Sequence, residues 1–129
     1  MTEAELIDAI GAEVAEHNSA TPQALSMVED GLKRFPKSAR LWILRGDLIQ
    51  VSDDDGRYFL DDALESYLAA LRCDPDSAEA NESIGHYLDA VQNEPEKAEP
   101  YFRRAIALGG GEGAQDGLKQ VLEQLGRTE

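Results

Sequence analysis

The sequence repeats itself with a period of about 34 residues, and this limits the possible folds more than any other feature. When the chain is shifted against itself by 39 residues, Ala24 falls on Ala63, Leu32 on Leu71, Pro36 on Pro75 and Gly46 on Gly85. With a shift of 35 residues, Ile7 falls on Trp42, Gly11 on Gly46, Ala63 on Ala98 and Tyr67 on Phe102. The longer shift applies to pairs that straddle residues 52–62, so we infer one repeat that carries an insertion of about five residues in that acidic stretch.

Each repeat has the pattern of two helices. Leu6, Ile7, Ile10 and Val14 have helical spacing, and Thr2 with Glu5 is a capping-box signature. Further start signals are Thr21-Pro22, Ser38, Asp76 with Glu79, and Asn93-Glu94-Pro95. A fourth helix is predicted from about Leu60 to Cys73, and a seventh follows the break at Gly109–Gly111. The sequence therefore predicts an all-α protein of seven helices.

These residues resemble the tetratricopeptide repeat, whose pattern is W-x2-L-G-x2-Y, then A-x3-F, then P. The second repeat matches it with Trp42, Gly46, Ile49, Ala63, Tyr67 and Pro75; the first matches with Gly11, Ala24, Val28 and Pro36, and the third with Ile84, Gly85, Ala98 and Phe102. Arg45, Asn81 and Gly110 depart from the pattern. The resemblance covers nearly the whole chain and implies one domain, residues 1–129, folded as a right-handed α-solenoid of antiparallel helix pairs. The repeats would span about 3–37, 38–76 and 77–111, with a capping helix over about 113–126. Gly46 and Gly85 would let the two helices of a pair approach closely.

The charge and the composition exclude several classes of protein. Twenty-six acidic residues face twelve Lys and Arg, giving a formal net charge of -14, which argues against nucleic acid and anionic membranes as partners. Cys73 is the only cysteine, so no intrachain disulfide can form. The N-terminal residues lack the pattern of a signal peptide, and no apolar run is long enough to cross a membrane. We therefore expect a cytoplasmic protein.

Neither catalysis nor a cofactor is indicated. His17 and His86 belong to different repeats, and neither is expected to have a second metal ligand at a spacing such as i, i+4. Cys73 precedes Asp74, whose charge would raise a thiol pKa. The glycines at 109–111 follow a helix rather than a strand, so they are not a phosphate-binding loop. The sequence predicts no enzyme, no metal site and no cofactor.

The acidic stretch at residues 52–62 invites comparison with the calcium-binding loop. With Gly56 at the sixth position of that loop, the first position is Val51, which cannot bind a cation. We therefore interpret the stretch as an elongated turn, with Asp55-Gly56 in a tight bend and Asp61 and Asp62 near a helix N-terminus. Phe59 and Leu60 are expected to hold the turn against the helices. A minor role in recognition stays open.

In tetratricopeptide proteins the first helix of each pair lines a concave surface that binds peptides or protein segments. By resemblance, the candidate groove residues are Glu5, Asp8, Arg40, Ile43, Asp47, Gln50, Glu79, Glu82, His86 and Asp89. Six of these ten are acids, which favours a basic or neutral protein or peptide partner. The predicted function is thus a protein-interaction module or scaffold. The alternatives are a structural protein that self-associates as a homo-oligomer and, more remotely, an acidic metal-binding module.

Overall fold

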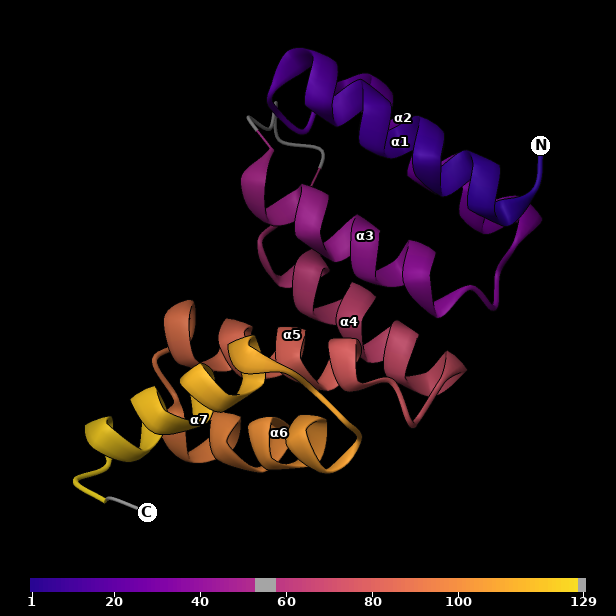
Figure 1. Cartoon of the computed structure of the whole chain (residues 1–129). Coiled ribbons are helices and arrows are strands. Elements are labelled where there is room, and N and C mark those ends of the chain that lie inside the picture. The colour runs from indigo at the N-terminus through magenta and orange to yellow at the C-terminus, as the bar shows by residue number, and fades with distance from the viewer. Residues whose placement is uncertain (53–57, 128–129) are drawn as a thin grey trace. The chain divides into compact units, whose positions relative to one another are not determined.

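The computed structural model describes residues 1–52 and 58–127. Within them the chain is all-helical, and the one β-type contact is an isolated bridge between Ala20 and Ser52. Seven helices follow one another: α1 (Glu3–His17), α2 (Pro22–Arg34), α3 (Ala39–Val51), α4 (Asp61–Cys73), α5 (Ala78–Ala90), α6 (Pro95–Ala107) and α7 (Glu112–Gln124). The predicted fold class and number of helices are confirmed for the described part of the chain (Figure 1).

Local capping chemistry explains where most of the helices begin. The Thr2 side chain accepts a hydrogen bond from the Glu5 N–H while Glu5 accepts one from the Thr2 N–H, which completes the predicted capping box of α1. The Thr21 and Ser38 hydroxyls cap α2 and α3 by accepting the Ala24 and Leu41 N–H, and each such cap stabilises a helix by about 1 kcal/mol. The predicted cap of α5 is wrong by one residue, because the Ser77 hydroxyl, and not Asp76, accepts the Ala80 N–H.

The helices gather into two compact units. Unit 1 is Met1–Cys73 and contains α1 to α4, and unit 2 is Asp74–Glu129 and contains α5 to α7. In unit 1 each helix packs on the next, most extensively α3 on α4. In unit 2, α6 packs on both α5 and α7, and α5 also touches α7. The division into three repeats with a capping helix stays a prediction.

Large aromatic residues packed against glycines form the centre of both units. In unit 1 the Tyr67 ring of α4 is fully buried against Gly46 of α3. In unit 2 the buried Phe102 ring of α6 lies against Gly85 of α5 and Gly117 of α7. Burying each such ring contributes about 2–3 kcal/mol. The prediction that Gly46 and Gly85 permit close helix approach is therefore confirmed, because a Cβ on either would overlap the ring.

None of the helices in the described ranges combines the length and the apolar character that crossing a membrane requires.

Candidate interaction surfaces

The predicted groove residues of α1 are exposed, but one of them has a structural task. Glu5 belongs to the capping box, and its hydrogen bonds with the Thr2 N–H and hydroxyl lower the pKa of its carboxyl. Asp8, one turn further along α1, is exposed. Of these two predicted groove carboxylates, Asp8 is therefore the better placed to meet a ligand.

On α3, two predicted groove residues are joined through the core tyrosine. The Tyr67 hydroxyl donates a hydrogen bond to Asp47 Oδ1 at 2.6 Å and accepts one from Gln50 Nε2 at 2.6 Å. Arg40 is exposed, whereas Ile43 is only 2% exposed. The expectation that Ile43 lines an open groove is therefore wrong, because its apolar side chain is part of the core.

On α5, Glu82 and His86 lie together and Glu79 is exposed in the first turn. Glu82 Oε2 lies 3.5 Å from His86 Nε2, and the His86 ring contacts Phe102 edge-on at a centroid distance of 4.9 Å. Glu82 also faces the start of α7, because a Cβ on Gly113 would lie 2.6 Å from its Oε2. A carboxylate is favourable at a helix N-terminus, so this contact stabilises α7 as well.

Asp89 does not lie at an open surface. It is 8% exposed, and its Oδ1 accepts a hydrogen bond from Gln124 Nε2 of α7 at 2.9 Å. The expectation that Asp89 contributes charge to a groove is therefore corrected. A carboxylate this buried needs hydrogen-bond partners, and here a helix more than thirty residues away supplies one.

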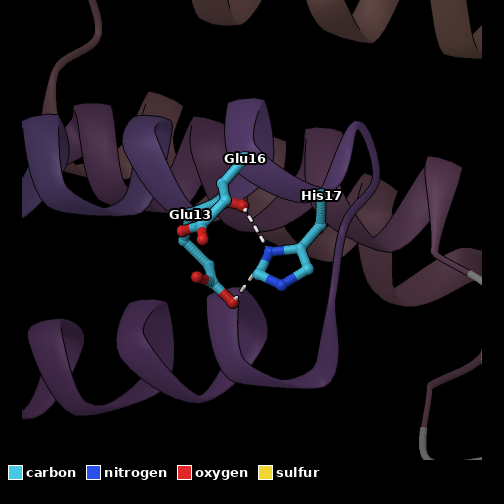
Figure 2. Close-up of side chains that lie close together, drawn as sticks. All are labelled: Glu13, Glu16 and His17. Atoms are coloured by element: carbon cyan, nitrogen blue, oxygen red, sulfur yellow. Dashed lines mark hydrogen bonds and ion pairs between the residues drawn. The ribbon is translucent and has the colours of Figure 1, made fainter.

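The expectation that neither histidine has a partner at i, i+4 is also wrong. Glu13 lies four residues before His17, and Glu82 lies four residues before His86. On α1, Glu13, Glu16 and His17 bring one potential ligand atom each within 4.8 Å of the others (Figure 2). The signal that could have found this cluster is local, because a carboxylate four residues before a histidine is visible in the sequence.

Glu13 and His17 of this cluster have partners within the protein itself. His17 Nδ1 lies 3.1 Å from the Glu13 carbonyl oxygen and 3.5 Å from its carboxylate. Figure 2 marks both interactions with dashed lines. Thr21 Oγ1 donates to Glu13 Oε1. The carbonyl of Glu13 and then its charge raise the pKa of His17. The cluster therefore acts as a local brace at the end of α1, and three side chains on one exposed helix do not by themselves make a metal site.

Arg45, one of the departures from the repeat pattern, is the centre of a polar network in unit 1. Its Nε donates to Glu29 Oε1 of α2 at 2.8 Å, and its Nη1 donates to Ser66 Oγ of α4 at 2.7 Å. The guanidinium also lies over the rings of Trp42 and Tyr58, at 5.8 and 5.5 Å from their centroids. Arg45 thus links α2, α3 and α4 where an apolar residue would make only packing contacts.

The fold resembles that of PilW. A solved structure of PilW, described as a widely conserved type IV pilus biogenesis factor, superposes with a TM-score of 0.80 at 27% sequence identity. The match covers 96% of this chain and 55% of the PilW chain, so the chain spans about half the length of PilW. No family model matches the sequence, and neither does any curated protein.

Two further surfaces lie outside the predicted groove residues. In unit 2 a hollow of about 370 Å³ is bordered by α6 and α7 and by Arg127, with Ile106, Leu118 and Leu122 forming its apolar part. In unit 1, Phe59 is 76% exposed and Leu60 is 48% exposed. The expectation that these two residues hold the acidic turn against the helices is therefore wrong. The predictions on Asp55 and Gly56 fall outside the described residues.

Proposed function

We propose that this chain is a protein-interaction module of the tetratricopeptide type, without enzymatic activity of its own. The observation that carries the proposal is the likeness to PilW over nearly the whole chain, together with helix pairs packed through glycine contacts. Helical-repeat folds present successive helices as an extended surface, which suits them to binding protein segments. If the module shares the role named for PilW, its partners belong to the assembly of a type IV pilus.

In each unit, the proposed binding surface consists of the predicted groove residues that remain exposed or partly exposed on its own first helices. On α1 and α3 these are Glu5, Asp8, Arg40, Asp47 and Gln50, and on α5 they are Glu79, Glu82 and His86. Carboxylates predominate among them, which supports a basic or neutral ligand, because exposed charges of one sign speed association with the opposite sign and suppress like-charged partners. A cytoplasmic location stays a prediction.

A peptide array with a matched pair of variants tests the proposal. Asp8→Lys reverses one charge on α1, and Glu65→Lys makes the same change on α4, outside the proposed surface. Both side chains are exposed, so the folded state should tolerate both changes. We expect wild type to prefer peptides rich in Lys and Arg over acidic peptides of equal length, with binding that weakens as salt is added.

Asp8→Lys should weaken the binding of these basic peptides several-fold, by about 1 kcal/mol, and Glu65→Lys should weaken it less. Equal effects of the two variants would mean that net charge alone attracts the peptides. A preference for acidic peptides would refute the proposed surface. If wild type instead shows a mass that rises with concentration and Asp8→Lys abolishes that rise, self-association is the better account.

A further inference from the structure

Three of the large exposed apolar residues belong to one end of the α3–α4 pair in unit 1. Five large hydrophobic residues are substantially exposed among the described ones: Met1, Val51, Phe59, Leu60 and Val91. Val51 is the last residue of α3, while Phe59 and Leu60 directly precede α4. Because α3 and α4 form an antiparallel pair, these three belong to the same end of it. Single exposed apolar residues are ordinary, but a concentration of them indicates a contact surface.

The backbone that carries Phe59 is held on both sides. On the N-terminal side, the Tyr58 hydroxyl donates to Glu29 Oε2 at 3.3 Å, and Arg45 lies over the Tyr58 ring. On the C-terminal side, the Phe59 N–H donates to Asp62 Oδ2 at 2.9 Å, and the Phe59 carbonyl accepts the Asp62 N–H at 2.9 Å. The Leu60 carbonyl likewise accepts the Ala63 N–H at 3.0 Å.

This arrangement holds the backbone in place at an exposed aromatic residue. A residue on a loose loop could turn inward and cover itself, whereas the Phe59 backbone is held by hydrogen bonds and the residue is 76% exposed. Binding through such a residue requires little further ordering of the chain, and ordering is one of the main costs of association. Aromatic residues are enriched at protein interfaces, and a few anchor residues usually dominate the binding energy there.

The charges around the anchor indicate what it would contact. Asp61 and Asp62 follow Phe59 and Leu60 directly, at the N-terminus of α4, and the whole chain carries a net charge of -14. A second copy of the chain or an anionic bilayer would bring like charges together at this surface. A protein segment with an apolar stripe bordered by Lys and Arg matches both the apolar centre and the acidic border.

We propose that Val51, Phe59 and Leu60 form an anchor surface that docks an apolar, basic-bordered segment of a partner protein. None of these residues belongs to the proposed groove surface, so the anchor is a second contact. It goes beyond the proposed function, and the two can fail separately: Asp8→Lys tests the groove, and Phe59→Ser with Leu60→Ser tests the anchor.

A phage-displayed library of random peptides is the probe. Peptides are selected on wild type and then depleted on the Phe59→Ser/Leu60→Ser variant. The enriched peptides should combine aromatic or aliphatic residues with Lys or Arg, and should bind the double variant at least tenfold more weakly, because an anchor residue of this kind dominates its interface. Val91→Ser, which removes an exposed apolar residue of unit 2, serves as the control and should change binding less than twofold.

The double variant should keep the helical signal and thermal midpoint of wild type, since both side chains are exposed. The proposal is overturned if no peptide distinguishes wild type from the double variant, or if the distinguishing peptides are acidic. It is also overturned if wild type dimerises and the double variant does not, because the anchor would then serve self-association.

Discussion

Replacing Gly46 by alanine tests whether the close packing of α3 on α4 sets the stability of unit 1. A Cβ at this position would lie 2.5 Å from Cε1 and 2.7 Å from Cζ of the Tyr67 ring. The ring has little freedom to move away. It is fully buried, and its hydroxyl is held between Asp47 and Gln50 by two hydrogen bonds of 2.6 Å.

Gly11 is the matched control, because it occupies the equivalent position of the preceding repeat. A Cβ on Gly11 would have no atom within 4 Å. Both glycines are inside helices, so both substitutions gain about 1 kcal/mol of helix propensity. Overpacking a core costs about 1–3 kcal/mol, and only Gly46→Ala incurs that cost.

The difference between the two variants isolates the packing effect. We expect Gly11→Ala to be about 1 kcal/mol more stable than wild type, and Gly46→Ala to be about 1–3 kcal/mol less stable than Gly11→Ala. Urea unfolding followed by circular dichroism measures this. With an m-value of about 1–3 kcal/mol per molar urea, the two midpoints should differ by roughly 1 M.

A second substitution checks the cause. In a Tyr67→Leu background the ring is absent, so Gly46→Ala should lose most of its penalty relative to Gly11→Ala. If Gly46→Ala is as stable as Gly11→Ala in the wild-type background, the ring is not the obstacle. That result would falsify the packing argument.

Two further predictions concern polar contacts in unit 1. Arg45→Met keeps an apolar side chain but removes the charged hydrogen bonds to Glu29 and Ser66. It should lower the free energy of unfolding, measured by urea titration, by about 1–3 kcal/mol. An unchanged free energy of unfolding would show that the network makes no net contribution to stability. The pKa of His17 is raised in the folded state, so its stabilising effect is complete below the unfolded value of about 6.5 and is lost as pH rises through the folded value. The urea midpoint of wild type minus that of His17→Gln should therefore be larger at about pH 5.5 than at about pH 8, and a pH-independent difference would contradict this.

Several features of the fold were predictable because they depend on neighbouring residues. The caps at Thr2, Thr21 and Ser38 involve side chains and N–H groups three residues apart. The contacts of Gly46 and Gly85 were predictable from the repeat, which places a small residue opposite Tyr67 or Phe102 each time. The Glu13–His17 pair is equally local, since its two side chains are one helical turn apart, yet the prediction for His17 overlooked it.

The candidate site was less predictable, since groove positions were assigned by register alone. The position in the repeat places Ile43 and Asp89 on the first helices, but it does not predict which residues pack against them. Asp89 is buried because Gln124 reaches it from α7, and the repeat contains no sign of that contact. Phe59 was expected to hold the acidic turn against the helices, whereas it is exposed and the chain around it is held by the bonds of Tyr58 and Asp62.

The sequence by itself determined the seven helices, the caps of α1, α2 and α3, and the contacts of Gly46 and Gly85 with aromatic rings, because these follow from spacing along the chain and from the size of individual residues. The tertiary structure alone decided which polar groups remain available to a ligand. Arg45 meets Glu29 across sixteen residues, and Asp89 meets Gln124 across thirty-five. Such pairs form only after the helices pack. A carboxylate that the helical pattern predicts to be exposed can therefore be buried, or hydrogen-bonded to another helix, in the folded protein.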